Sequence, residues 1–268
     1  MKILYIAEIT GKAGVWLVKT KLHDLKQKYS PDFVIANGNS ATGSGGLGKQ
    51  HAGYLKKLGI DCITAGDLAF QKKDLVDVLD NTFYVLRPVN LPYTSPGRGY
   101  KFAYSTKNEK LAIISLLGRI GSHKIMSENP YIEAEKLVAK LQNETDFIFI
   151  DFSSFATAEK QALAFMLDGK VSAVIGSGTR VQTADERILQ KGTAYITDAG
   201  RTGSLNSVGG YAVKEKLQEY ISCLPDFGRD TWERPVIQGL FLEIGAQGKA
   251  VKIERVFEES EPCENMEP

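Results

Sequence analysis

The chain has 268 residues and an ordinary globular composition, with 43% hydrophobic residues, 24% charged residues and a formal net charge of +1. This length supports one large α/β domain or two small ones, and the near-neutral charge gives no long-range attraction to nucleic acid or to an anionic membrane. We find no signal-peptide pattern and no apolar run of membrane-spanning length, and three widely spaced cysteines argue against a disulfide framework. We therefore expect a cytoplasmic protein that does not bind a membrane, and nothing in the sequence indicates a nucleic-acid partner.

Short apolar runs alternate with helical patterns from the start of the chain. Residues 3–6 form a continuous apolar run, which is typical of a buried strand in a parallel sheet. A loop at residues 8–14 precedes a helix whose apolar positions, three and four residues apart, extend from Val15 to Tyr29. The next expected elements are strand 32–36, a glycine-rich loop 38–48, helix 54–58, strand 61–64, helix 74–79 and strand 83–86.

The same alternation continues through the rest of the chain. The expected elements are strand 111–117, helix 132–141, strand 147–152, helix 158–167, strand 171–175 and strand 194–196. Apolar residues then alternate with a period of two at 240–244 and 251–253, which predicts a hairpin. No linker divides the chain, so we expect one domain over residues 1–257 and an acidic disordered tail over residues 258–268.

The loops that follow the expected strands are the first place to look for a site. Ligands of open α/β sheets bind beyond the carboxyl ends of the strands. In this chain those loops begin at Glu8, Asn37, Gly66, Asp151 and Gly176.

These five loops, in this order, resemble the five metal-binding motifs of the YmdB-like, calcineurin-type metallophosphoesterases. The resemblance covers nearly the whole chain and is most specific outside the loops, at residues 87–92, 181–185, 191–198 and 251–255. It implies an α/β fold of the metallophosphoesterase type, a two-sheet sandwich with flanking helices (α/β/β/α). Members of the family bind two metal ions and hydrolyse phosphodiesters, including cyclic nucleotides.

Many residues that act in the family are replaced in this chain. Asn39 stands where the family has the carboxylate that bridges the two metals, Ser40 stands at the ligand beside it, and Leu68 replaces the catalytic histidine. The complete set of substituted metal-ligand positions is Glu8, Asn39, Ser40, Asp67, Ser153, Gly178 and Arg180.

The chain also lacks the imidazoles that such a centre needs. All four histidines of the family motifs are absent, and His23, His51 and His123 lie outside the motif loops, where we expect packed or solvated residues. Because the family chemistry requires hard oxygen ligands together with imidazoles, we expect no metal and no other cofactor.

These substitutions predict a catalytically degenerate protein, more a pseudoenzyme than an enzyme, with a binding, regulatory or scaffold role. The crevice has two explanations. In one, an unused site has eroded. In the other, the Arg180 guanidinium binds a phosphate-type anion with help from Thr179, Ser40 and Ser153. The expected partners are a second copy of the chain in a homo-oligomer, another protein, and a phosphate or nucleotide ligand.

In the alternative hypothesis the protein is an active enzyme. It is a metal-dependent phosphodiesterase, acting on a cyclic nucleotide or a related phosphodiester, with an altered metal site that uses Glu8 and Asp67 to bind Mg, Mn or Fe weakly. Arg201 could add positive charge to the crevice around Arg180, but a solvated loop arginine is the preferred interpretation of that residue.

Overall fold

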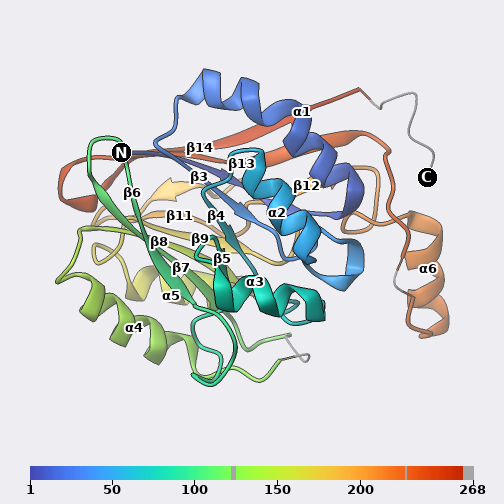
Figure 1. The fold of residues 1–268 in the computed structure, drawn as a ribbon, viewed down its shortest axis with the longest axis horizontal. Coiled ribbons are helices and arrows are strands. Elements are labelled where there is room, and N and C mark those ends of the chain that lie inside the picture. Colours follow the sequence, from blue (N-terminus) through green and yellow to red (C-terminus); the bar gives the residue numbers. More distant parts are fainter. Residues whose placement is uncertain (122–124, 227, 262–268) are drawn as a thin grey trace.

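The computed structural model describes residues 1–121, 125–226 and 228–261. Two β-sheets pack face to face, and helices cover the outer face of each sheet (Figure 1). The predicted α/β/β/α sandwich is therefore confirmed.

The first sheet combines a parallel core with antiparallel additions at one side. Its parallel strands, in spatial order, are β1 (Lys2–Ile6), β3 (Phe33–Asn37), β4 (Cys62–Thr64) and β5 (Val85–Leu86). On the other side of β1 follow β13 (Pro235–Ile244), β12 (Arg201–Ser204) and β2 (Glu8–Ile9), and β14 (Ala250–Glu259) also pairs with β13. The predicted C-terminal hairpin is the pair β13 and β14.

The second sheet is parallel at its centre and antiparallel at both edges. Its order is β10 (Arg187–Ile188), β11 (Ala194–Ile196), β9 (Ala173–Ser177), β8 (Phe147–Ser153), β7 (Lys110–Leu117) and β6 (Tyr100–Tyr104). The short edge strands β5 and β6 thus lie at the ends of their respective sheets.

The apolar run at the start of the chain is continuous because both faces of its strand are covered. Successive side chains of a strand point to opposite faces. Ile3 and Tyr5 belong to the apolar core between the two sheets, whereas Leu4 and Ile6 belong to the core between the first sheet and its helices. A strand with one solvated face would instead alternate apolar with polar residues.

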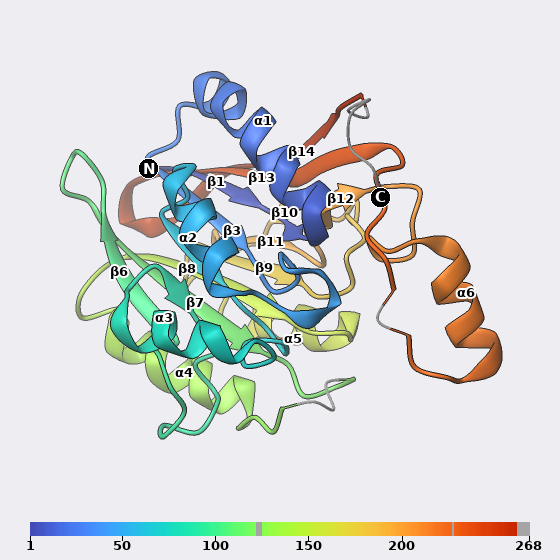
Figure 2. The ribbon, with the colours of Figure 1, turned by 45° about the vertical axis from the view of Figure 1, so that its right-hand side comes forward.

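The helices form the two outer layers. Those against the first sheet are α1 (Gly11–Tyr29), α2 (Lys49–Lys57) and α3 (Val76–Asn81), and those against the second are α4 (Pro130–Leu141) and α5 (Thr157–Met166). Short 3-10 turns lie at Gly43–Gly45, Lys73–Leu75 and Ala246–Gly248. The remaining helix, α6 (Val213–Ser222), lies beside the sandwich in two views and buries none of its residues (Figures 1 and 2).

Several elements were not predicted from the sequence: β2, β6, β10, β12 and α6. Helix α1 also begins at Gly11, inside the segment expected to be a loop. The short strands are set by tertiary pairing rather than by a local pattern, since β12 pairs with β2 and β13. Strand β14 continues to Glu259, two residues past the expected domain boundary at 257, and residues 262–268 of the expected tail lie outside the described residues.

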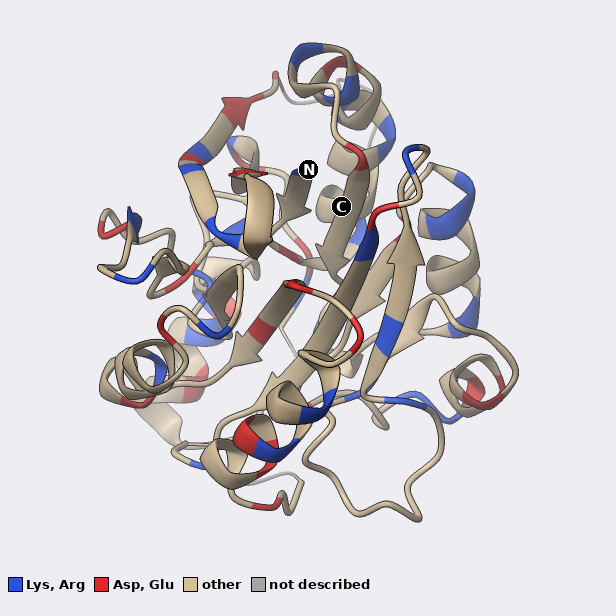
Figure 3. Ribbon diagram, turned by 90° about the vertical axis from the view of Figure 1, so that its left-hand side faces the viewer, with Lys and Arg blue, Asp and Glu red and all other residues tan. Residues whose placement is uncertain are grey.

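Charged residues lie mainly on helices and loops, with both signs interspersed (Figure 3). This distribution agrees with the net charge of +1. Over the described ranges, no helix combines the length and apolarity needed to cross a membrane.

Candidate functional site

The segments that follow the parallel strands meet at one edge of the two sheets. Glu8 follows β1 and opens β2, and Ser40 lies beyond β3, where it forms a parallel bridge with Thr10. Arg180 follows β9 of the other sheet, and its side chain contacts both Glu8 and Ser40. The topology therefore brings three of the predicted site residues into one cluster.

Arg180, Glu8 and Ser40 form a closed ring of hydrogen bonds. Nε of Arg180 donates to Oε1 of Glu8 over 3.0 Å, and Nη2 donates to Oγ of Ser40 over 2.6 Å. Oγ of Ser40 in turn donates to Oε1 of Glu8 over 2.6 Å. The third guanidinium nitrogen, Nη1, donates to the carbonyl of Gly209 over 3.2 Å. These bonds fix the plane of the guanidinium.

Burial affects the pKa values of both charged residues in this ring. The Glu8 side chain is 1% exposed and that of Arg180 is 20% exposed. Burial raises the pKa of the Glu8 carboxyl, and Arg180 and Ser40 offset only part of that effect. Burial alone would lower the pKa of Arg180, but the Glu8 carboxylate, with a smaller contribution from Asp67, outweighs it, so this pKa is raised.

The backbone at Arg180 is held in an uncommon conformation. Its φ is +60°, in the left-handed region that non-glycine residues rarely adopt, and it comes shortly after Gly178 with φ +106°. Such backbone strain persists where the surroundings fix it, and it concentrates at functional sites.

Asn39 organises the loop that carries Asp67. Its Nδ2 donates to Oδ1 of Asp67 over 2.9 Å, while its Oδ1 accepts from the backbone N–H groups of Gly66 (2.7 Å) and Leu68 (3.1 Å). An amide suits this position because the side chain must donate a hydrogen bond on one side and accept hydrogen bonds on the other. The replacement of the family carboxylate by Asn39 therefore has a structural consequence.

Ser153, Gly178 and Leu68 form one wall of the site. Ser153 is buried beneath two glycines, since a Cβ at Gly66 would lie 2.6 Å from its Oγ and a Cβ at Gly178 would lie 3.3 Å from it. Leu68 is 5% exposed and, like Gly178, lines the neighbouring cleft. The wall is therefore closely packed and apolar at the position of the family's catalytic histidine.

Asp198 explains the position of Thr179. Oδ2 of Asp198 accepts from Nζ of Lys160 (2.8 Å) and from both N (2.9 Å) and Oγ1 (2.7 Å) of Thr179, and its Oδ1 accepts from N of Gly200 (2.9 Å). The Lys160–Asp198 pair is completely buried. The Thr179 hydroxyl, expected to bind an anion, donates to Asp198 instead.

Asp151 is a second buried acceptor beneath the site. Its Oδ2 accepts from the hydroxyl of Tyr5 (2.8 Å), from Nδ2 of Asn37 (3.0 Å) and from the hydroxyl of Thr64, and its Oδ1 accepts from Oγ of Ser177 (2.6 Å). Burial raises the pKa of Asp151, and these hydrogen bonds oppose the rise. The network links strands of both sheets below the cleft.

A cleft of about 610 Å³ opens beside the Arg180 ring. Asp67, Leu68, Arg180, Tyr211 and residues of α6 line it. Tyr211 is 4% exposed, and its buried hydroxyl has no hydrogen-bond partner among the described residues. The centre of the Arg180 guanidinium lies 5.6 Å from the Tyr211 ring. An unpaired buried hydroxyl next to a cation suits an incoming anionic oxygen.

Tyr211 and Lys160 were not predicted from the sequence as residues of the site, and the prediction for Arg201 was wrong. Arg201 is a β12 residue that is 6% exposed, and it donates from Nη1 to the carbonyl of Arg180 over 2.7 Å, so the expected solvated loop arginine is wrong. The position of Lys160, three and four residues before Leu163 and Ala164 on the buried face of α5, was the one available signal for a buried lysine. Tyr211 had no comparable signal.

The residues present do not fit the dinuclear metal centre that the sequence resemblance implies. In the part of the chain that the structure describes, no three His, Cys, Asp or Glu side chains are grouped as metal ligands. One oxygen of Glu8 accepts from Arg180, and one oxygen of Asp67 accepts from Asn39. His23 pairs with Gln27 and His51 with Thr42, whereas His123 lies outside the described residues.

Comparison with known proteins identifies the family to which the chain belongs. A family model described as YmdB-like protein matches residues 4–256. The chain belongs to the YmdB-like family. This YmdB-like protein is 38% identical over 258 residues to the 2',3'-cyclic-nucleotide 2'-phosphodiesterase of Bacillus subtilis (strain 168), with 96% of this chain and 97% of that protein covered.

Solved structures give the same result for the fold. A hypothetical protein from Thermus thermophilus matches with a TM-score of 0.89 at 30% identity, covering 97% of this chain and 100% of that one. A novel phosphatase from Mycoplasma pneumoniae matches with a TM-score of 0.88 at 30% identity, covering 97% and 93%. The YmdB-like chain therefore has the metallophosphoesterase-type fold.

These relatives correct the functional prediction. A catalytically degenerate protein with only a binding, regulatory or scaffold role was expected from the missing ligands. Relatives that match this YmdB-like chain over nearly its whole length are named as a phosphodiesterase and a phosphatase, which supports the alternative, an enzyme acting on phosphoesters. The prediction of a pseudoenzyme is therefore wrong. Residues other than the family's metal ligands must then be considered for the chemistry.

Proposed function

We propose that this chain is a phosphodiesterase whose substrate class is the nucleoside 2',3'-cyclic phosphates. The observation that carries the proposal is the Arg180 guanidinium, which Glu8 and Ser40 hold beside the cleft. The similarity to a 2',3'-cyclic-nucleotide 2'-phosphodiesterase supports both the reaction and the substrate class.

Arg180 binds and polarises the phosphoryl group. A guanidinium is charged at every physiological pH and offers two parallel N–H donors to two oxygens. Because Glu8 and Ser40 fix its orientation, little reorganisation accompanies the increase in negative charge on the phosphoryl oxygens in the transition state. Glu8 and Ser40 act here as positioning residues.

Asp67 acts as the general base and Tyr211 as the general acid. Asp67 lines the cleft and uses Oδ1 to accept from Asn39, so its second oxygen takes the proton of the attacking water. The water oxygen forms a bond to phosphorus, the ester P–O bond breaks, and the departing oxygen receives the proton of the Tyr211 hydroxyl. Burial raises the pKa of Tyr211, which keeps that proton in place at neutral pH. Solvent then carries the proton from Asp67 back to Tyr211.

No step of this proposal passes through a metal ion, because the donor set does not fit the family's centre. The guanidinium supplies the positive charge on the phosphoryl oxygens that a cation would otherwise provide. The proposed cofactor requirement is therefore none.

Steady-state assays with 2',3'-cyclic AMP and bis-p-nitrophenyl phosphate test the proposal. Wild type should turn over the cyclic nucleotide, and Asp67→Asn should lower kcat by about 100-fold, a typical contribution of a general base. Asp77→Asn, which removes a 73% exposed carboxylate on α3, is the matched control and should retain full activity. Equal activity of Asp67→Asn and wild type would contradict the assignment of Asp67, and absent turnover of both substrates by wild type would contradict the proposal itself.

We further propose that the protein works in the cytoplasm as a homo-oligomer. Helix α6 supports the second part, because its exposed apolar residues recur every three or four positions: Val213, Leu217, Tyr220 and Ile221. A second copy of the chain would cover this stripe. Light scattering should give a mass above 29.4 kDa for wild type and a monomer mass for Leu217→Glu/Ile221→Glu. A monomeric wild type would contradict this proposal.

A further inference from the structure

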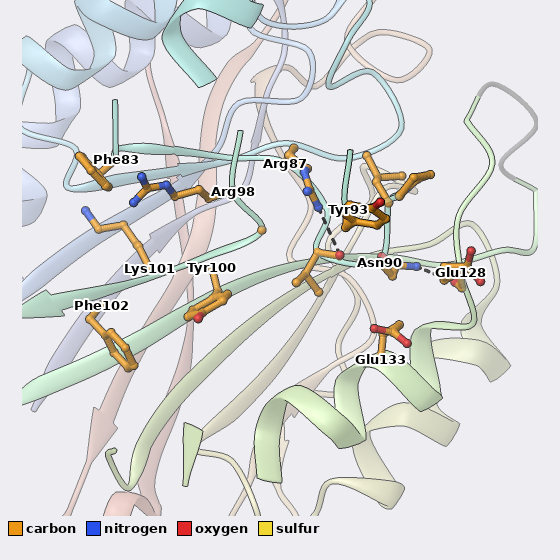
Figure 4. Close-up of a pocket in the computed structure, with 14 residues that line it drawn as sticks. Phe83, Arg87, Asn90, Tyr93, Arg98, Tyr100, Lys101, Phe102, Glu128 and Glu133 are labelled. Carbon is orange, nitrogen blue, oxygen red and sulfur yellow. Dashed lines mark hydrogen bonds between the residues drawn. The ribbon is translucent and has the colours of Figure 1, made fainter. Parts of the chain in front are cut away.

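A second cavity lies away from the Arg180 cleft. Its volume is about 1050 Å³, and it opens between the loop that follows β5 and the edge strand β6 (Figure 4). It shares no lining residue with the cleft. A cavity of this size is sufficient for a small organic ligand.

A buried arginine without a counter-ion lines this cavity. Arg87 is 6% exposed, and its Nη1 donates to the carbonyls of Pro88 (2.8 Å) and Val89 (3.2 Å). Within the described ranges its Nε is buried and has no hydrogen-bond partner, and no carboxylate pairs with the guanidinium. Burial lowers the pKa of Arg87. An unpaired buried charge is unfavourable, so this side chain indicates a missing anion.

Two further cations and several aromatic rings line the same cavity. Figure 4 shows Phe83, Arg98 and Lys101 grouped at one end, with Arg87 nearer the middle. The Arg98 guanidinium lies over the Phe83 ring at 4.0 Å, and Lys101 makes no ion pair with the described residues. Tyr93, Tyr100 and Phe102 add aromatic surface. Positive charge beside flat apolar rings suits an anion that carries a planar ring.

The opposite end of the cavity is acidic. Glu128 and Glu133 lie there, near Asn90 (Figure 4). Nδ2 of Asn90 donates to the carbonyls of Leu117 (2.8 Å) and Glu128 (2.9 Å), and its Oδ1 accepts from N of Leu117 (3.0 Å). The two carboxylates are therefore the groups that remain to accept from a ligand. A ligand that complements both ends has an anionic group at one end and hydroxyl or amino donors at the other.

We propose that this cavity is a second ligand site, which binds a nucleoside monophosphate. Arg87, Arg98 and Lys101 take the phosphate, the aromatic residues contact the base, and Glu128 and Glu133 accept from the donor groups. The site is independent of hydrolysis in the Arg180 cleft. It would stand even if the proposed reaction failed.

Calorimetric titration of the full chain with adenosine 5'-monophosphate tests this site, with inorganic phosphate and adenosine as separate probes. Arg87→Met is the obvious variant, but it also removes bonds to two backbone carbonyls and could unfold the loop. The double variant Arg98→Ala/Lys101→Ala is therefore the main test, because it changes an exposed and a half-exposed side chain. Lys73→Ala/Lys140→Ala removes the same charge at two exposed positions outside the cavity and is the matched control.

The nucleotide should bind wild type and the control equally, and at least about tenfold more weakly to the Arg98/Lys101 variant. Arg180→Met, which alters only the cleft, should leave this affinity within about twofold of wild type. Binding that is lost in Arg180→Met, or unchanged in the Arg98/Lys101 variant, would place the nucleotide elsewhere and overturn the proposal. Phosphate binding as tight as that of the nucleotide would overturn the role of the aromatic residues.

Discussion

Arg180 and Glu8 form an ion pair beside the cleft, with 3.0 Å between Nε and Oε1, although 172 positions separate them in the sequence. The pair joins the loop after β9 of one sheet to β2 of the other. Ser40 bridges both members, so the guanidinium cannot rotate without breaking two side-chain hydrogen bonds. A fixed cation thus stands among the positions that the sequence resemblance predicts to be metal ligands.

Arg180→Lys tests whether orientation matters in addition to charge. Lysine keeps the positive charge but cannot donate to Glu8 and Ser40 while binding two phosphoryl oxygens. We expect kcat/KM for 2',3'-cyclic AMP to fall by about 10-fold to 100-fold, which corresponds to roughly 1.4–2.7 kcal/mol. Activity equal to wild type would show that a point charge is sufficient and would remove the role given to Glu8 and Ser40.

The pH dependence of stability tests whether burial or the ion pair with Arg180 has the larger effect on the pKa of Glu8. Because burial raises its folded-state pKa above 4.5, the folded protein binds more protons than the unfolded chain in that range. The stabilisation by protonated Glu8 is therefore complete below about pH 4.5 and is lost as the pH rises through the folded-state pKa. Glu8→Gln stays neutral, so the unfolding free energy of wild type relative to Glu8→Gln should fall by on the order of 1 kcal/mol between about pH 4.5 and pH 7.5.

Urea unfolding of both proteins across this range gives the measurement. If the unfolding free energy of wild type relative to Glu8→Gln instead increases as the pH rises, the ion pair with Arg180 outweighs burial.

Asn39→Asp tests whether one substitution restores a metal centre. The new carboxylate oxygen would face Oδ1 of Asp67 at the 2.9 Å now spanned by a hydrogen bond, and two like charges would repel. We expect the unfolding free energy to fall by about 1–3 kcal/mol and the melting temperature to drop by several degrees. Elemental analysis after incubation with Mn²⁺ should find no stoichiometric metal. Stoichiometric Mn²⁺ with an unchanged melting temperature would disprove our account of Asn39.

Tyr211→Phe separates catalysis from stability. The hydroxyl has no hydrogen-bond partner among the described residues, so its removal should change the unfolding free energy by less than about 0.5 kcal/mol. If Tyr211 protonates the departing oxygen, kcat should nevertheless fall by about 100-fold. Tyr54→Phe, at an exposed position of α2, serves as the control in the same assays. If Tyr211→Phe is destabilised but keeps a normal kcat, the hydroxyl contributes to stability and is not the proton donor.

The layered fold was predictable because its signals are local. The apolar run at residues 3–6 and the alternation in the final hairpin follow from which faces are buried, and the structure contains both. The meeting of Glu8, Ser40 and Arg180 was also predictable, since they follow strands whose carboxyl ends share one edge.

Other features depend on tertiary contacts that no local pattern encodes. Strand β12 exists because β2 and β13 pair with it, and Lys160 is tolerated in the core because Asp198 and Thr179 meet it there. Tyr211 comes from a segment outside every recognised motif. The loss of catalysis was inferred from absent ligands alone, and the Arg180 guanidinium was considered as an anion-binding group but not as a catalytic one.

Hydrolysis of 2',3'-cyclic AMP by wild type and Arg180→Met, each with excess EDTA and with added Mn²⁺, tests the central claim most directly. We predict that wild type forms the nucleoside monophosphate at the same rate under both conditions, and that Arg180→Met loses at least about 100-fold in kcat/KM. No hydrolysis by wild type under either condition, or full activity of Arg180→Met, would contradict the claim that this chain is a phosphodiesterase built around Arg180.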